Sequence, residues 1–359
     1  MHPDDARNYL IRQACEAGFA HVRLVTVRQT PRIAAYDAWL SAGHQADMHW
    51  MVRGRDDRAE PARRVPGVQT ALVIAVDHAH RRPSDPGGLT GMVARYAWGR
   101  DYHNVVGKRL RKLVKRLRGQ GIGAWGGVDT AAILERAWAE ASGLGFVGKN
   151  TLLIRPGTTS WSVLGVVFVD MVATADQPIE RDHCGRCTRC LVACPTQAFP
   201  SPWTLDARRC IAYWTIESRD LPPRRLRPGF GRWVFGCDVC QEVCPHNHTP
   251  PDPVEDAFAP RNAWLDLPEL LKTPDDALIE RFTGTPLRRP GAVGLKRNAA
   301  IVLGNIGRAE GIEPLQRYGL THSSPVVRAS AVWALWRLGV PPGSPDPDPL
   351  VRSEQEAAR

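Results

Sequence analysis

The stretch HCGRCTRCLVACP, residues 183–195, determines how the middle of this chain folds, and FGCDVCQEVCP, residues 235–245, is its counterpart. The first reads Cys-x2-Cys-x2-Cys-x3-Cys-Pro, the second reads Cys-x2-Cys-x3-Cys-Pro, and Cys210 lies between them. Three cysteines of such a run bind one cubane iron–sulfur cluster, and the cysteine before the proline binds the other cluster of a pair. The two runs therefore predict a ferredoxin-like domain with two [4Fe–4S] clusters.

This spacing rule gives a definite ligand set for each cluster. The first cluster is assigned to Cys184, Cys187, Cys190 and Cys244. The second cluster is assigned to Cys194, Cys210, Cys237 and Cys240. The second half departs from the compact ferredoxin spacing, because 26 residues separate Cys210 from Cys237.

Structural zinc and disulfide bonds are the alternative uses of so many cysteines. Zinc sites favour two Cys-x2-Cys pairs, often with histidine, and need no further cysteine followed by proline. Disulfides are favoured in secreted chains, and the first 25 residues mix acids and bases with no secretory signal. The ninth cysteine, Cys15, is expected to be a buried thiol on the first helix.

Composition predicts a globular protein of the cytoplasm. The 359 residues suggest two or three domains, and a hydrophobic content of 43% is ordinary. No apolar run approaches the ~18 residues that span a bilayer, so no membrane association is expected. The formal charge is +10. Two oxidised clusters with their thiolates would leave roughly +6, which makes nucleic acid a candidate partner, although solubility alone explains a modest excess.

The first 175 residues combine amphipathic helices with buried strands. Helices are expected at 4–18, 36–51, 104–118 and 133–142, with Gly43 interrupting the second. ALVIAV at 71–76 and WSVLGVVFVD at 161–170 have the branched apolar composition of buried strands. Strands separated by helices predict a three-layer α/β domain over residues 1–175.

The rest of the chain divides into a cluster domain at 176–250 and a region of all-helical pattern beyond Ala263. Residues 251–262 are rich in proline and acid and are expected to form a linker. Residues 296–307 and 328–339 align at an offset of 32, which predicts HEAT-like helical repeats within 251–340. Proline and charge dominate 341–359, so this tail is expected to be disordered.

Basic side chains on the 104–118 helix and on the later segments are candidates for phosphate contacts. A bare charge run is usually a solvated face, and that alternative stays open. Phosphate contacts give salt-dependent affinity without reading sequence. The candidates are Lys108, Arg111, Lys115, Arg224, Arg225, Lys296 and Arg297.

Several motifs outside the cysteines are also informative. They include Trp39-Leu-x-x-Gly43-His-x-x-Asp47-Met, Arg95-Tyr96-Ala-x-Gly99-x-Asp101-Tyr102-His103, Val128-Asp129-Thr-Ala, Gly143-Leu-Gly-Phe-x-Gly148-Lys149-Asn150-Thr151 and Gly236-Cys-Asp-Val-Cys-Gln-x-Val-Cys-Pro245. Together they resemble the epoxyqueuosine reductases, which catalyse the last step in making the tRNA wobble base queuosine. The resemblance covers about 1–250 densely, and the helical repeats also fit the family's bacterial members.

The resemblance implies a cobalamin in the N-terminal domain, with no histidine below the cobalt, that receives electrons from two [4Fe–4S] clusters. The implied reaction turns the epoxide of a modified guanosine at the wobble position into an alkene and water. The family's proton donor maps to Asp129, whose pKa is expected to be raised by a partly dry site. The alternative role for Asp129 is to cap the following helix.

The resemblance also implies further site residues and partners. Lys149 is expected near substrate or paired with Glu135. The implied partners are a tRNA with epoxyqueuosine at the wobble position and an electron donor such as a ferredoxin or flavodoxin, and the chain is expected to be a monomer. The implied cobalamin contacts are Arg58, Tyr96, His103, Asn150, Thr151 and Ser160.

Two other functions compete with this interpretation. One is another cobalamin-dependent reductase, such as an enzyme similar to the reductive dehalogenases. The other is a non-catalytic iron–sulfur subunit that transfers electrons and binds nucleic acid through its C-terminal region. The second alternative predicts no bound corrinoid, so the visible spectrum of the purified protein distinguishes it.

Overall fold

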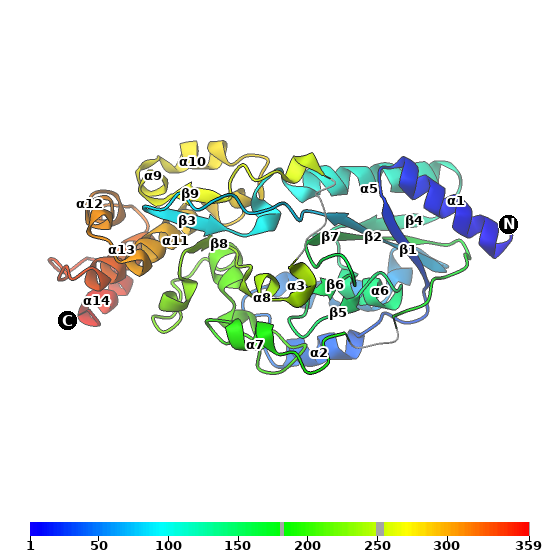
Figure 1. Ribbon diagram of the computed structural model, residues 1–359, viewed down its shortest axis with the longest axis horizontal. Coiled ribbons are helices and arrows are strands. Elements are labelled where there is room, and N and C mark those ends of the chain that lie inside the picture. Colours follow the sequence, from blue (N-terminus) through cyan, green and yellow to red (C-terminus); the bar gives the residue numbers. More distant parts are fainter. Residues whose placement is uncertain (180–182, 249–254, 359) are drawn as a thin grey trace.

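An antiparallel four-stranded sheet with strand order β1-β2-β7-β4 forms one end of the elongated molecule (Figure 1). The computed structural model describes residues 1–179, 183–248 and 255–358. Both central strands occur where the sequence predicts buried strands. The strands are β1 (His21–Thr26), β2 (Thr70–Asp77), β7 (Ser162–Val169) and β4 (Ala124–Gly127).

Helices cover both faces of this sheet because its central strands are apolar on both sides. Leu72 and Ile74 of β2 pack against α1 (Pro3–Glu16) and α5 (Tyr102–Gly119). Val73 and Ala75, which point the other way, pack against α6 (Glu135–Ala141). The side-chain alternation of a strand thus separates two apolar cores. The remaining elements of this region are α2 (Ile33–Ser41), α3 (His49–Arg53), α4 (Arg55–Ala59), β5 (Phe146–Val147) and β6 (Leu153–Ile154).

A second sheet joins the three regions that the sequence divides into domains. β3 (Thr90–Val93) pairs in parallel with β8 (Trp233–Phe235) and antiparallel with β9 (Trp264–Asp266). The predicted boundaries at 175 and 250 therefore do not separate independent cores. The all-helical expectation beyond Ala263 is also wrong, because β9 is a strand.

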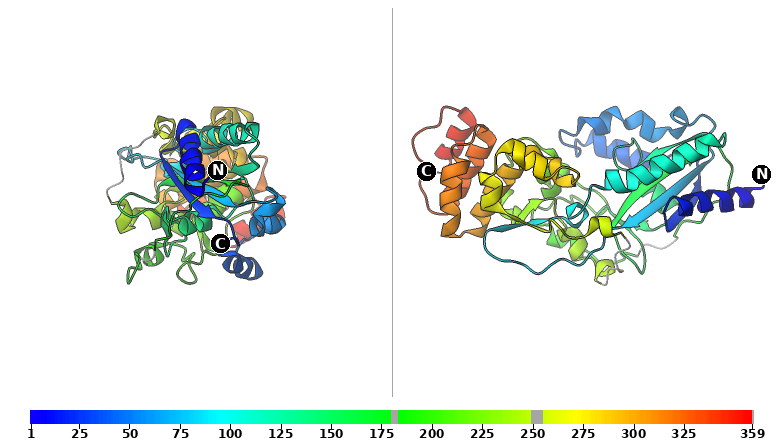
Figure 2. Two further views of the ribbon diagram at one scale, coloured as in Figure 1. Left: turned by 90° about the vertical axis from the view of Figure 1, so that its right-hand side faces the viewer. Right: turned by 90° about the horizontal axis from the view of Figure 1, so that it is seen from above.

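The C-terminal helices lie at the opposite end of the molecule from the first sheet (Figure 2). α11 (Gly291–Ile306) packs closely on α13 (Pro325–Arg337), since a Cβ on Gly304 would lie 2.8 Å from the Ala334 Cα. The two helices contain most of the segments 296–307 and 328–339, which align at the offset of 32. The other helices here are α9 (Leu267–Lys272), α10 (Asp275–Arg281) and α12 (Ile312–Pro314), and the short helices of the cluster region are α7 (Arg189–Ala193) and α8 (Val239–Glu242).

The expectation of a disordered tail at 341–359 is wrong. Residues Pro349–Glu356 form α14, whose Val351 is buried against α13. Glu354 accepts two hydrogen bonds from the buried Arg227, at 2.9 and 2.7 Å, and one from Arg224 at 3.0 Å. The hydrogen bonds from the two arginines and the burial of Val351 hold this segment in place, although its composition is polar.

The expected linker also packs where the structure describes it. Residues 251–254 lie outside the described residues, but Phe258 is fully buried in the core beneath α5. In the described residues, no helix combines the length and apolar character required to cross a membrane.

Glu354→Ala should lower the stability of the fold by about 3–5 kcal/mol, because it leaves the Arg227 guanidinium buried without its carboxylate. The measurement is the urea midpoint of the whole chain, followed by tryptophan fluorescence, since Arg227 lies 5.6 Å from the Trp333 ring. Glu356→Ala on the exposed side of the same helix is the matched control. Equal midpoints for the two variants would contradict a structural role for the tail.

Candidate active site and cluster sites

Four of the cysteines line one small cavity. Cys184, Cys187, Cys190 and Cys244 surround a volume of about 120 Å³, and Lys149, Arg189 and His246 complete its wall. The loop turns tightly, with the Cys187 N–H donating to the Cys184 carbonyl at 2.8 Å. Three sulfurs thus come from one loop and the fourth comes from the distant Cys-Pro, in the grouping that the spacing predicts for the first cluster.

The other four cysteines form a second group deeper in the molecule. Burial raises the pKa of the Cys240 thiol, and the neighbouring sulfurs of Cys210, Cys190 and Cys194 raise it further. Burial likewise raises the pKa of Cys237, with Cys210 and Cys240 nearby. Cys190 and Cys240 bring the two groups next to each other. Cys15 is exposed, so the expectation of a buried thiol is wrong.

Residues 149–160 connect the first sheet to the cluster region. The Asn150 side chain donates to the Cys240 carbonyl at 3.2 Å, and Lys149 donates to the carbonyls of Gly185 and Cys187. Ser160 bonds to Gln241 and Asn247. These polar atoms position the cluster loops. Lys149 therefore does not pair with Glu135, while its expected approach to substrate or phosphate stays a prediction.

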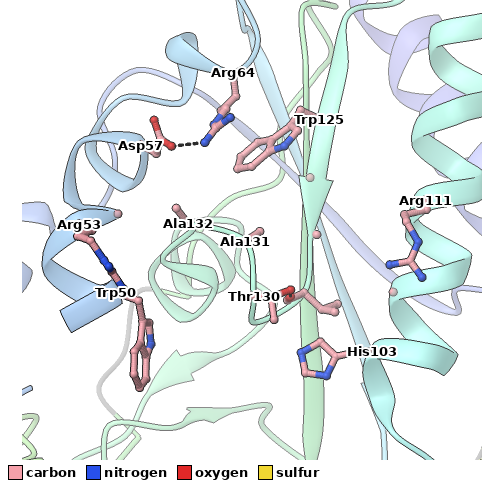
Figure 3. A pocket seen from close by; sticks show the side chains of 15 residues that line it. Trp50, Arg53, Asp57, Arg64, His103, Arg111, Trp125, Thr130, Ala131 and Ala132 are labelled. Atoms are coloured by element: carbon pink, nitrogen blue, oxygen red, sulfur yellow. Dashed lines mark hydrogen bonds and ion pairs between the residues drawn. The ribbon is translucent and has the colours of Figure 1, made fainter. Parts of the chain in front are cut away.

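A larger cavity of about 550 Å³ opens beside the edge strand β4 (Figure 3). α3, α4 and the following turn form one wall, and the start of α5 forms the opposite wall. The loop 128–132 lies between them. The lining includes Trp50, Arg53, Asp57, Arg64, His103, Arg111, Trp125 and Thr130.

Asp129 lies within this loop, at the end of β4. Its φ of 45° is in the left-handed region, which an aspartate adopts at some cost. The N-cap of α6 is Leu134, without a side-chain cap, so the alternative that Asp129 caps this helix is wrong. Its carboxylate instead accepts a hydrogen bond from the Tyr102 hydroxyl at 2.6 Å and lies 3.4 Å from His103 Nε2.

The pKa of Asp129 is lowered, contrary to the expectation. Loss of hydration among the surrounding groups raises this pKa, but the contacts with His103 and Tyr102 outweigh it. The His103 pKa is raised to about 9, because its imidazole is hydrogen-bonded to Asp101 and lies 3.4 Å from the Asp129 carboxylate. At neutral pH the site therefore holds an aspartate anion beside an imidazolium.

Glu135, at the start of α6, is a second unusual acid near the loop. Burial raises its pKa to about 8. Its Oε1 is buried without a hydrogen-bond partner in the described part of the chain. The raised pKa favours the neutral carboxylic acid form of Glu135 at pH 7.

The expected cobalamin contacts are dispersed. Among the described residues of that set, His103 lines the larger cavity, and Tyr96 makes an edge contact with the ring of Tyr102, the neighbour of His103. Arg58 lies on α4, and its side chain is buried against Tyr36 and the Met51 sulfur. The Thr151 carbonyl accepts a bond from Arg136 at 2.6 Å.

The expected tRNA contacts divide into exposed and buried residues. Lys108, Arg111 and Lys115 are exposed along one face of α5, and Arg225 is exposed too. Arg224 is held by Glu354. The expectation is wrong for Lys296 and Arg297, whose side chains are buried. Lys296 pairs with Asp275 at 2.6 Å. Arg297 donates to the carbonyls of Ser218 and Asp220 at 2.8 Å each.

Sequence reasoning missed a stacked pair at the cavity. Trp50 is 39% exposed, and the Arg289 guanidinium lies 5.5 Å from its ring centre. Glu217 holds Arg289 at 2.9 Å. The pair joins residues 239 positions apart, so no local pattern could have revealed it.

Comparison with known proteins gives the same family from several directions. Residues 58–130 match the family model described as "Epoxyqueuosine reductase QueG, DUF1730", and residues 183–247 match the "4Fe-4S double cluster binding domain". The epoxyqueuosine reductase of Xanthomonas campestris is 38% identical over 349 residues, covering 94% of this chain and 98% of that protein. The chain belongs to the epoxyqueuosine reductase family.

Solved epoxyqueuosine reductases share the whole fold. One, crystallised with an epoxyqueuosine-modified tRNA-Tyr stem loop, superposes with a TM-score of 0.88 at 27% identity, covering 99% of this chain and 98% of that one. Another, from Bacillus subtilis, has its aspartate catalytic loop swung out of the active site. Its TM-score is 0.86 at 25% identity, again covering 99% of this chain and 98% of that one. As a member of this family, the chain is an oxidoreductase with a double [4Fe–4S] domain.

The crossed ligand sets predict which cysteine pairs act on the same cluster. Cys244→Ser should halve the iron content from about eight atoms per chain. Adding Cys184→Ser should remove little further iron, because both cysteines are assigned to the first cluster. Adding Cys194→Ser to Cys244→Ser should instead remove both clusters. Iron analysis and electron paramagnetic resonance after anaerobic reconstitution measure this, with Cys15→Ser as the control. An uncrossed arrangement would make Cys184 and Cys194 equivalent.

Proposed function

We propose that the chain reduces the epoxide of epoxyqueuosine at the tRNA wobble position to queuosine, using cobalamin and two [4Fe–4S] clusters, with Asp129 passing the proton to the leaving oxygen. The observation that supports this most is an open cavity lined by Val128 and Thr130, the two neighbours of Asp129 in the chain. The Asp129 backbone is in the left-handed conformation, and its carboxylate is in contact with Tyr102 and His103. Strain of this kind is characteristic of functional positions.

The cavity has the polar groups that a corrinoid needs. Corrin side chains are amides, which require both donors and acceptors. β4 is an edge strand, so one side of its backbone is not used by β7, and Gly126 and Gly127 line the cavity. Arg53, Arg64 and Thr130 add side-chain donors around it. Bound cobalamin would supply a strongly reducing cobalt centre that accepts the electrons from the clusters.

The stacked Trp50–Arg289 pair suits an unstacked anticodon base. RNA-binding proteins commonly hold splayed bases on aromatic rings and guanidinium planes. The solved relative with a modified tRNA stem loop supports tRNA as the substrate. We assign backbone phosphates to the face of Lys108, Arg111 and Lys115, because these exposed cations follow α5 away from the cavity.

The remaining partners follow from the same chemistry. An electron carrier such as a ferredoxin or flavodoxin would reduce the clusters one electron at a time. We retain the expectations of a monomer and of HEAT-like repeats built on α11 and α13. The repeats would extend the tRNA-binding surface from residues other than the buried Lys296 and Arg297.

Single-turnover conversion of epoxyqueuosine-containing tRNA tests the reaction. The anaerobically reconstituted protein should form queuosine with cobalamin and a strong reductant, and should form none without cobalamin. Asp129→Asn should slow the step by about 10²–10⁴-fold while the bound-corrinoid spectrum persists, because the amide cannot relay a proton. Asp170→Asn, at the end of β7 and outside the cavity lining, is the control. No conversion with intact clusters and bound corrinoid would refute the substrate, and no corrinoid binding would favour an electron-transfer subunit.

Salt dependence separates the two kinds of tRNA contact. Replacing Lys108, Arg111 and Lys115 by Gln should weaken binding and lower the slope of log affinity against log salt by about 0.7–0.9 for each phosphate that is no longer neutralised. Trp50→Ala should weaken binding by roughly 1–3 kcal/mol without changing that slope, because stacking carries no counterion. Trp203→Ala removes a similarly exposed tryptophan, 44% accessible, and is the control. Parallel changes in affinity and slope in both variants would contradict these assignments.

A further inference from the structure

The proton balance of the proposed reaction raises a question about Asp129. Opening an epoxide to an alkene and water consumes two electrons and two protons. Asp129 is held as an anion by its neighbours, so it has no proton to give until another group supplies one. The supplier must touch the carboxylate, and two adjacent residues of α5 do so at the same oxygen, Oδ2.

We propose that His103, oriented by Asp101, is the acid that loads Asp129 with the proton for the leaving oxygen. This inference rests on the proposed function and adds a role for a residue that the resemblance places at cobalamin. In the first step, His103 Nε2 gives its proton to Asp129 Oδ2, and Asp129 gives it to the oxygen as the first carbon–oxygen bond breaks. The imidazole then regains a proton from water, and the same relay delivers the second proton as the second carbon–oxygen bond breaks, so the oxygen leaves as water. The two electrons come through the clusters from the electron carrier of the proposed function.

The geometry resembles a carboxylate–imidazole relay. Asp101 Oδ1 lies 2.8 Å from His103 Nδ1, and Asp101 also caps α5 by accepting the His103 N–H at 2.8 Å. A bond from Nδ1–H to the carboxylate leaves Nε2 facing the second partner. Nε2 is buried, has no hydrogen-bond partner in the described chain, and lies 3.4 Å from Asp129. A small movement of the loop would close this contact.

The supports of the relay are rigid. The Asp101 N–H donates to the Gly284 carbonyl at 2.8 Å, which ties the cap to the C-terminal region. The Tyr102 ring stacks on the imidazole with ring centres 4.2 Å apart. The Tyr102 hydroxyl has its pKa raised far above the ordinary value by burial and by Asp129, so it acts as a fixed donor and does not supply a proton. His103 is the member of this relay whose pKa lies nearest to neutrality.

The charges around His103 favour its protonated form. Asp101 and Asp129 raise its pKa to about 9, against the opposing effect of burial. The His103 imidazole is therefore protonated below its ordinary pKa of ~6.5 and loses its proton as the pH rises through about 9. The other groups that interact electrostatically with Asp129 are Tyr96, Tyr102, Glu135, Arg136 and Arg289. Arg111 lines the same wall of the cavity as His103, and Arg53, Asp57 and Arg64 line the opposite wall (Figure 3).

Glu135 is the rival proton source. It is half-buried, its pKa is raised to about 8, and it interacts electrostatically with Asp129. No hydrogen bond joins the two carboxyl groups among the described residues, whereas His103 is in ion-pair contact. The experiment therefore compares variants of both residues.

Nuclear magnetic resonance of histidine-labelled holoprotein provides a readout independent of turnover. The resonance missing from His103→Gln identifies His103. Its titration should centre near pH 9 in the wild-type protein and move toward ~6.5 in Asp101→Asn. Asparagine preserves the helix cap, so Asp101→Asn removes the charge without removing the cap. A wild-type midpoint near 6.5 would overturn the proposal even if no queuosine were formed.

Single-turnover rates across pH 5.5–9.5 provide the second test of the proposed role of His103. His103→Gln should be about 10²–10³-fold slower at every pH. Asp101→Asn should lose rate at pH 8 and regain most of it at pH 6, where the imidazole is again protonated. If Asp101 had only a structural role, Asp101→Asn would lower the rate equally at pH 6 and pH 8. Wild-type rates in His103→Gln, or a loss confined to Glu135→Gln, would overturn the proposal, whereas a wild-type protein without queuosine formation refutes the proposed function instead.

Discussion

The convergence of eight sulfurs into two crossed groups constrains most of this fold. Each group takes its last member from the other half of the motif, so residues 195–236 must leave the first loop and return beside it. That return carries β8 onto β3, which brings a segment of the N-terminal region into the same sheet. β9 then adds the C-terminal helices to the far edge. The three regions are thus connected by the path that the cysteines impose.

The same constraint reaches the proposed active site through one carboxylate. Asp238, between Cys237 and Cys240, accepts the Arg95 N–H at 2.8 Å. Arg95 begins the segment that continues into Asp101 and His103. The cluster loop therefore positions the start of α5, and α5 in turn positions the partners of Asp129. The cluster loop and the partners of Asp129 are therefore far apart in the sequence but are linked through the hydrogen bond between Asp238 and Arg95.

The sequence predicted those features that depend on spacing and periodicity. The central strands and α5 were found within a few residues, because their apolar pattern is set by the sheet they cover. The cysteine grouping followed from loop geometry. Arg297 was misplaced, because the carbonyls that satisfy its guanidinium belong to residues 218 and 220 and have no local signature. The tail was expected to be disordered for the same reason, because Glu354 of α14 is held by Arg227, which lies 127 residues away in the sequence. The lowered pKa of Asp129 likewise depends on a contact between separate elements.

In the proposed reaction, electrons and protons would approach the larger cavity by different routes. The two cysteine groups adjoin at Cys190 and Cys240, so electrons would cross between the clusters inside the molecule. The contacts that hold the proton lie at the start of α5, on the wall of the cavity open to water. In the proposed reaction, keeping the two carriers apart would prevent a reduced centre from meeting protons before the substrate arrives, which would otherwise consume the electrons in forming hydrogen. The loop that holds Asp129 in a left-handed conformation would contribute to this separation, because the proposed relay delivers the proton only when that loop and the substrate are both in place.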